Sequence, residues 1–175
     1  MSIDRTVASF NSLAGAAVGR GPRDLEGVRG KSFGRVEEFL SSYPRLRTDV
    51  GYVGFLMNYS GAVIEDAEGR QFVDIFGFSD VSSDIIEIEG DVVDEYGFLI
   101  FAQCMYHDIR DGVLIDSYEY DFAYNVGGSG EFGVYCGRST LGSRDTSFQP
   151  YCGNFLSWLQ DLVAVKGWFE RPTFG

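Results

Sequence analysis

The chain has 175 residues and a formal net charge of −12, from 26 acidic residues and 14 lysines and arginines. Apolar residues make up 45% of the chain and charged residues 23%, so it can form one packed domain and is not expected to be disordered. Lysine and arginine provide most of the affinity of proteins for nucleic acids and anionic membranes. The negative charge therefore argues against both as partners.

The sequence shows no pattern for export or for membrane insertion. Residues 1–21 lack the basic start and apolar run of a secretion signal, and no stretch reaches the roughly 18 apolar residues of a membrane span. The three cysteines, Cys104, Cys136 and Cys152, cannot form a complete set of disulfides and have no C-x-x-C spacing. Reduced thiols of this kind are typical of the cytosol. We therefore expect a cytoplasmic protein, and a monomer.

Charge is unevenly distributed along the chain. Residues 48–131 contain eighteen acidic residues and two arginines, a net charge of −16, whereas residues 1–47 carry +3 and residues 132–175 carry +1. A segment this acidic is either a solvated surface that keeps the protein soluble or a docking face for a basic partner protein. Composition alone leaves both interpretations open.

The N-terminal segment, residues 1–31, is rich in glycine and poor in large apolar residues. This composition predicts a mobile or loosely docked arm. A regular apolar pattern begins at Ser32, so we expect the folded domain to occupy residues 32–175.

Two short helices are predicted at the start of this domain. Apolar residues recur with helical spacing from Val36 until Pro44, where the helix must stop. The same spacing returns after a cap at Thr48 or Asp49 and continues until Gly61.

Between Gly61 and Tyr135 the apolar pattern changes to that of strands. The segment from Tyr118 to Val126 alternates aromatic and polar residues, which predicts one aromatic core face and one polar face. The strand-like segments are 62–65 and 71–78, which flank a turn-rich insert at 66–70, followed by 97–104, 118–126 and 131–135.

A third helix is predicted near the C-terminus, from Phe148 toward Gly167. Thr146 or Ser147 would cap it, and Pro150 would lie in its first turn. Helices followed by strands and a final helix indicate an α+β fold. We expect a central antiparallel or mixed sheet of about five to six strands, flanked by the three helices.

Any histidine-based catalysis would have to use His107, the single histidine. A nucleophile–base pair could join His107 to Cys104, to Asp108 or to a serine elsewhere, and a zinc site could use Cys104 with His107. No second ligand pair or nucleophile elbow accompanies them. Gly127–Gly130 lies between predicted strands, which favours a hairpin turn over a phosphate-binding loop. Carboxylate pairs such as Asp108 with Asp111 are expected by chance in so acidic a segment. We predict that the protein is not an enzyme, uses no cofactor or metal, and holds His107 in a dispensable loop.

Four short motifs follow one another along the domain. They are Leu46–Leu56 continuing to Asn58–Gly61, the apolar run Phe98–Ala102, the Asp-Gly turn and strand Asp111–Asp116, and the pairs Ser147-Phe148 and Phe155-Leu156. In this order they resemble the SUKH superfamily, the Smi–Knr type of domain, over roughly residues 32–165. The resemblance implies a non-enzymatic α+β binding domain. Many bacterial members look like immunity proteins that neutralise a cognate polymorphic toxin by covering it.

The sequence therefore predicts an immunity protein whose acidic segment docks onto a basic protein toxin, such as a nuclease-type domain. The alternatives are a regulatory or scaffold interaction module of the same fold and, less favoured, a small hydrolase that uses His107. Turns present side chains without disturbing a sheet, and tyrosine adds contact area to carboxylate pairing, so both types are candidates for the partner-facing surface. The predicted partner-binding residues are Asp80, Asp84, Asp91, Asp94, Glu95, Tyr96, Tyr106, Asp108 and Asp111.

Overall fold

The structure is a computed structural model, and it describes residues 2–21, 31–78, 97–127, 130–140, 143–144 and 147–169. Four α-helices, one 3-10 helix and eight strands are described in these ranges. In chain order they are α1 (Ile3–Asn11), β1 (Ala16–Arg20), α2 (Lys31–Ser42), the 3-10 helix η2 (Pro44–Thr48), α3 (Val50–Asn58), β2 (Tyr59–Glu65), β3 (Gln71–Ile75), β4 (Phe98–Arg110), β5 (Val113–Asn125), β6 (Val134–Thr140), β7 (Ser143–Arg144), β8 (Gln149–Cys152) and α4 (Phe155–Ala164).

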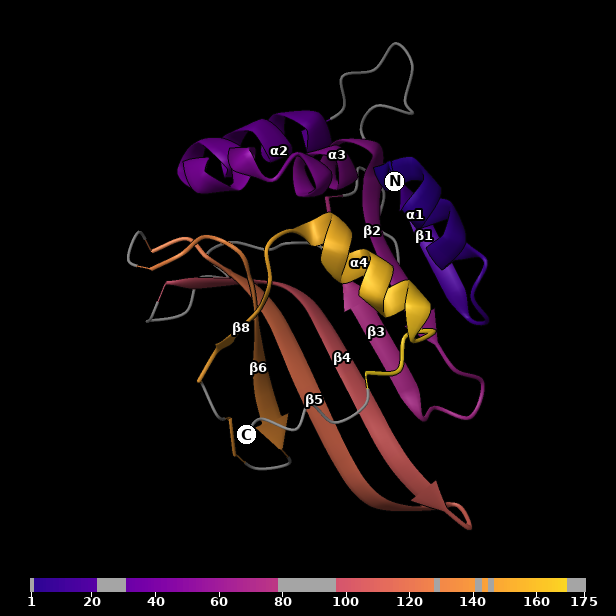
Figure 1. The fold of residues 1–175 in the computed structure, drawn as a ribbon. Coiled ribbons are helices and arrows are strands. Elements are labelled where there is room, and N and C mark those ends of the chain that lie inside the picture. Colours follow the sequence, from indigo (N-terminus) through magenta and orange to yellow (C-terminus); the bar gives the residue numbers. More distant parts are fainter. Residues whose placement is uncertain are drawn as a thin grey trace.

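The described strands form one sheet with antiparallel pairing throughout. Its order is β1-β2-β3-β4-β5-β6, and both β7 and β8 pair with β6. Figure 1 shows α4 lying across one face of the sheet, with α2 and α3 at its upper end and α1 beside β1. The predicted α+β fold is confirmed. The sheet has more strands than the five or six expected, because β1, β7 and β8 are edge strands of five residues or fewer.

The core lies between α3, α4 and the face of the sheet that α4 covers. Tyr52 from α3 and Phe155 from α4 have ring centroids 5.3 Å apart, and Phe101 from β4 lies 5.0 Å from the ring of Trp158. Tyr124 on β5 joins this cluster, 5.0 Å from Phe101. Burial of each such side chain stabilises the fold by roughly 1.5–3 kcal/mol. The aromatic face predicted for residues 118–126 is thus the core face.

The two helices predicted before the sheet are present. Helix α2 ends at Ser42, before Pro44, as the proline requires. Of the two predicted caps for α3, Asp49 closes the helix: its Oδ1 atom accepts hydrogen bonds from the backbone N–H groups of Gly51 and Tyr52, both at 3.1 Å. The helix then gives way directly to β2 at Tyr59.

The prediction of a loosely docked arm over residues 1–31 is wrong for residues 2–21, and Lys31 already belongs to α2. Val7 and Phe10 of α1 are only 4% and 1% exposed and belong to the core. Strand β1 pairs with β2 along one edge of the sheet. Gly15 lies in the turn between α1 and β1. Its φ angle is +73°, and a Cβ there would lie 2.0 Å from the carbonyl oxygen of Glu65. Glycine in this segment therefore permits a tight turn against β2, and the small residues form an edge strand.

The C-terminal helix begins later than predicted. Residues 149–152 form β8 against β6, and α4 starts at Phe155. Asn154 caps it by accepting a hydrogen bond from the backbone N–H of Ser157 at 2.9 Å, so the predicted caps Thr146 and Ser147 are wrong. Pro150 accordingly lies in a short edge strand, a place where a missing N–H is tolerated.

Candidate functional site

Most of the predicted partner-binding residues lie in one segment that falls outside the described residues. Tyr106, Asp108 and Asp111 are described, and all three belong to the hairpin of β4 and β5. The residues whose positions are not described are Asp80, Asp84, Asp91, Asp94, Glu95 and Tyr96.

The prediction that Tyr106 faces a partner is wrong, because its side chain is 1% exposed. The phenol O–H donates a hydrogen bond of 2.6 Å to the carbonyl of Gly167 and accepts one of 3.1 Å from the N–H of Phe169. Burial raises the pKa of this phenol. Tyr106 therefore fastens the segment after α4 to the sheet and is inaccessible to another protein.

The hairpin of β4 and β5 projects beyond its neighbours in the sheet, at the lower end of Figure 1. The pairing of β3 with β4 stops at Tyr106, and the pairing of β6 with β5 begins at Tyr118. Residues 107–117 thus form a two-stranded ribbon. Its turn is Asp111-Gly112, with φ angles of +52° and +76°, as a two-residue hairpin turn of the Asp-Gly kind requires.

Acidic side chains surround the tip of this ribbon. Asp108 forms an ion pair of 2.7 Å with Arg110, while Asp111 and Asp116 are exposed. Asp108 and Asp116 are cross-strand partners in the register of β4 with β5. Two of the predicted residues, Asp108 and Asp111, are therefore brought together at the surface, and Asp116 joins them.

The turn between β2 and β3 adds a second group of carboxylates that sequence reasoning treated only as a turn. Asp66 accepts hydrogen bonds from the backbone N–H groups of Glu68 at 2.6 Å and Arg70 at 3.2 Å. The Arg70 guanidinium lies 3.2 Å from Asp66 and 2.6 Å from Glu68. These contacts hold the pKa of Asp66 below its ordinary value, so it stays ionised.

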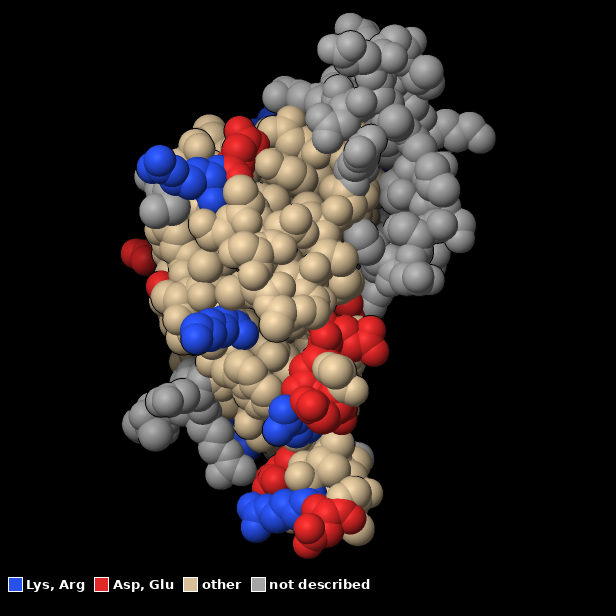
Figure 2. Space-filling model, turned by 90° about the vertical axis from the view of Figure 1, so that its right-hand side faces the viewer, with Lys and Arg blue, Asp and Glu red and all other residues tan. Residues whose placement is uncertain are grey.

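The two acidic turns are neighbours in the sheet, since the N–H of His107 donates a hydrogen bond of 2.8 Å to the carbonyl of Arg70. Figure 2 shows acidic side chains gathered in the lower part of the face that presents both turns, with Lys and Arg side chains among them. We call this surface the acidic edge. It comprises six acids and two arginines: Glu65, Asp66, Glu68, Asp108, Asp111 and Asp116, with Arg70 and Arg110.

A further group of acids lies on the sheet face opposite to the aromatic core. Asp74, Gln103 and Asp121 stand side by side on β3, β4 and β5. The Gln103 amide donates hydrogen bonds to Asp121 at 2.8 Å and to Glu119 at 3.0 Å. Asp74 is 3% exposed, and burial, with the nearby charge of Glu65, raises its pKa to about 6. The predicted polar face of β5 is present, but part of it is buried.

Of the residue pairs considered for catalysis, the structure separates His107 from Cys104 but places a serine hydroxyl, that of Ser117, beside His107. His107 lies in β4 and not in the predicted loop, and its Nδ1 is 3.0 Å from the Ser117 hydroxyl on the facing strand. Cys104 is buried on the core face, where desolvation raises its thiol pKa, whereas strand alternation turns His107 to the other face. A thiol and an imidazole on opposite faces cannot form a nucleophile–base pair.

Among the described residues, no three His, Cys, Asp or Glu side chains are grouped so that they could hold a metal ion. None of the described helices is long and apolar enough to cross a membrane. No protein-family model, curated protein or solved structure matches the chain significantly. The resemblance to the SUKH superfamily therefore stays a prediction that rests on its motifs.

Proposed function

We propose that this chain is a non-enzymatic protein-binding domain that recognises a basic partner protein through the acidic edge. Within that class we propose an immunity protein, which neutralises a cognate bacterial toxin by covering it. The SUKH-like motifs support a toxin as the partner. The charge and position of the acidic edge support electrostatic docking as the mode of binding.

The observation that carries this proposal is the excess of carboxylates at a projecting part of the sheet. The acidic edge has six acids and two arginines, a net charge of −4, and both arginines are already paired with neighbouring acids. Its turns are held by hydrogen bonds and by the Asp-Gly hairpin, so the carboxylates are presented on a fixed scaffold. A preformed surface of one sign accelerates association with a partner of the other sign.

Neutralisation of a toxin requires a high association rate constant, because the toxin acts as soon as it is present. A toxin that cuts nucleic acid carries a basic cleft for its substrate, and carboxylates can occupy such a cleft. The acidic edge therefore suits a basic, nuclease-type toxin domain.

An immunity protein is expected to be encoded next to its toxin, so the experiment measures association with the basic toxin domain that the neighbouring gene should encode. The test variant replaces Glu68 with Gln and Asp111 and Asp116 with Asn. Asparagine tolerates the positive φ of position 111, so the hairpin turn is retained. The matched control replaces Asp4, Glu38 and Asp161 with their amides, which changes the net charge equally at sites outside the acidic edge.

We expect the association rate constant of the test variant to fall several-fold and to depend less steeply on salt, with the control close to the original chain. Equal rates for both variants would contradict docking through the acidic edge. Binding without loss of toxin activity would instead support a regulatory or scaffold module.

A further inference from the structure

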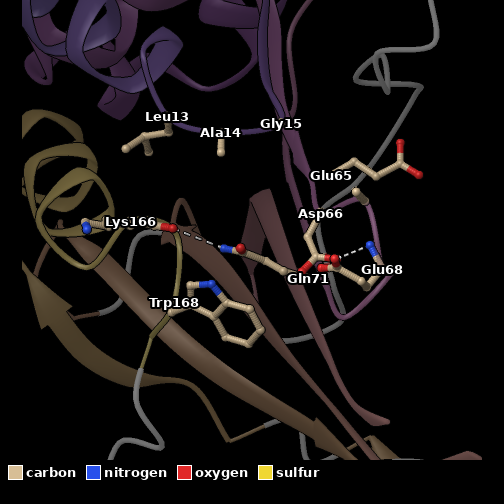
Figure 3. A pocket seen from close by; sticks show the side chains of 10 residues that line it. Leu13, Ala14, Gly15, Glu65, Asp66, Glu68, Gln71, Lys166 and Trp168 are labelled. Carbon is tan, nitrogen blue, oxygen red and sulfur yellow. Dashed lines mark hydrogen bonds between the residues drawn. The ribbon is translucent and has the colours of Figure 1, made fainter. Parts of the chain in front are cut away.

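A pocket of about 480 Å³ opens beside the acidic edge, among three segments that are distant in sequence. Its walls are the loop between α1 and β1, the β2–β3 turn with the start of β3, and the residues after α4. Figure 3 shows Leu13 and Ala14 on one side, Trp168 on the opposite side, and Asp66 and Glu68 on a third. Ligand pockets commonly have volumes of about 300–1,000 Å³, so this one can take a side chain of a partner.

Trp168 forms an aromatic wall that is accessible from solvent. Its side chain is 39% exposed, which is unusual for a large apolar residue, while its ring stacks on Tyr106 at 5.4 Å with an angle of 29° between the rings. The buried phenol thus fixes the orientation of the indole. An indole held in place with one face available is the best partner among the aromatic rings for a cation.

The wall formed by the β2–β3 turn is negatively charged. Asp66 and Glu68 share Arg70 as their cation, so two carboxylates face one guanidinium and a net negative charge remains. Lys166 also lines the pocket, but Figure 3 shows its ammonium end directed away from the carboxylates. The pocket therefore offers an aromatic surface and, on another wall, two carboxylates whose charge Arg70 neutralises only in part.

Gln71 adds a hydrogen-bond acceptor within the pocket. It is 4% exposed, and Figure 3 shows its side chain reaching between Ala14 and Trp168 toward Lys166. Its amide nitrogen donates to the Lys166 carbonyl at 3.4 Å, and its amide oxygen accepts no hydrogen bond from any described residue. This oxygen belongs to a residue that lines the pocket, so it can accept a hydrogen bond from a ligand that brings N–H groups.

We propose that this pocket binds the guanidinium group of an arginine from the partner protein. Arginine is the ligand that meets all three features, since its planar cation stacks on an indole, pairs with a carboxylate and donates several N–H groups. This assignment rests on the proposed function, because a basic partner would supply the arginine, and it names one contact within the proposed docking. Arginine is also among the residues that most often dominate binding energy at protein interfaces.

A short peptide tests the pocket without the partner protein. The probe is N-acetyl-Gly-Arg-Gly-amide, and the matched control peptide carries citrulline, a neutral side chain of nearly the same shape. The indole N–H resonance of Trp168 reports binding in the NMR spectrum and is assigned by its loss in Trp168→Phe. The other tryptophan, Trp158, is fully buried and serves as an internal reference.

We expect a saturable shift of the Trp168 resonance at millimolar arginine peptide and little shift with the citrulline peptide. Glu68→Gln should weaken binding at least threefold, whereas Glu38→Gln on α2 should not. In Trp168→Leu the backbone amides of Ala14 and Gly15 should lose their response, and in Trp168→Phe they should largely keep it. Equal responses to both peptides, or no saturation at about 50 mM, would overturn the assignment.

Failure of the pocket and failure of the proposed function are distinguishable. If the arginine peptide causes no saturable shift but the test variant associates with the toxin domain more slowly, the acidic edge remains the docking surface and the arginine site is contradicted. A positive titration with a test variant that binds the toxin domain normally would keep the arginine site and contradict docking through the acidic edge.

Discussion

The carboxylate of Asp49 accepts a hydrogen bond of 2.7 Å from the hydroxyl of Tyr124, seventy-five residues away in the sequence. The same oxygen accepts a second bond of 2.7 Å from the N–H of Phe155, and the other oxygen caps α3. One buried side chain therefore joins α3, α4 and β5. Loss of the acceptor from such a site leaves several buried donors without a partner.

Asp49→Ala should lower the free energy of unfolding by about 3–5 kcal/mol, because four donors lose their acceptor. Asp49→Asn, which keeps one acceptor oxygen, should cost less, and Tyr124→Phe about 1–2 kcal/mol. Urea unfolding measures all three, with Asp161→Asn as an exposed control near zero. A loss below about 1 kcal/mol in Asp49→Ala would show that the carboxylate does not organise the core.

Asp74 should make stability depend on pH. Its pKa of about 6 in the folded protein lies above the ordinary 3.8, so the folded state holds the proton more tightly. The resulting stability is fully present below about pH 4 and is lost as the pH rises through 6.

Asp74→Asn should therefore be more stable than the original chain at about pH 7.5, by on the order of 1–3 kcal/mol. The advantage should shrink by about 1 kcal/mol at about pH 5, where Asp74 of the original chain is largely protonated. Urea unfolding of both proteins at the two pH values measures this. A difference that is the same at both would contradict the raised pKa.

The N-terminal helix should contribute to global stability. Phe10 is 1% exposed and lies in the core, so Phe10→Ala should cost about 3–5 kcal/mol. Asn11→Ala, on the exposed side of the same helix, should stay within about 0.5 kcal/mol. Similar small losses for both variants would restore the idea of a loosely docked arm.

The three thiols should react slowly in the folded protein. Burial raises the pKa of Cys104 and brings that of Cys136 to about 12 and that of Cys152 to about 11, so few thiolates exist near neutral pH. A disulfide reagent at about pH 8 should modify Cys152, the least buried, first and the other two only on unfolding. Rapid modification of all three in native buffer would contradict this burial.

The sequence predicted those helices and strands in which apolar residues recur at a regular spacing and in which a residue such as proline marks the end. The aromatic alternation before Val126 and the apolar spacing before Pro44 each identified their element, and Asp49 was one of two expected caps. By contrast, β1 and β8 are short edge strands that form by pairing with β2 and β6. Their pairing is a tertiary contact, so neither carries a period of its own.

The candidate site was predicted only in part for a similar reason. Asp108 and Asp111 were expected at the surface because an Asp-Gly turn is a local signal. Tyr106 was misplaced, although strand alternation from the buried Cys104 would have turned it to the core. The pocket beside Trp168 could not be predicted, because its walls come from segments near residues 14, 66 and 168 that meet only in the folded chain.

The projecting ribbon has a consequence for solubility. Beyond Tyr118 the outer edge of β5 has no neighbouring strand among the described residues, and the side chains of Val113, Leu114 and Ile115 there are exposed. A bare apolar edge invites pairing with other chains and aggregation. Here a register shift near Ile109 distorts the ribbon, and charges close to the tip repel a second copy. We therefore expect the carboxylates that we assign to partner binding also to oppose self-association of the free protein.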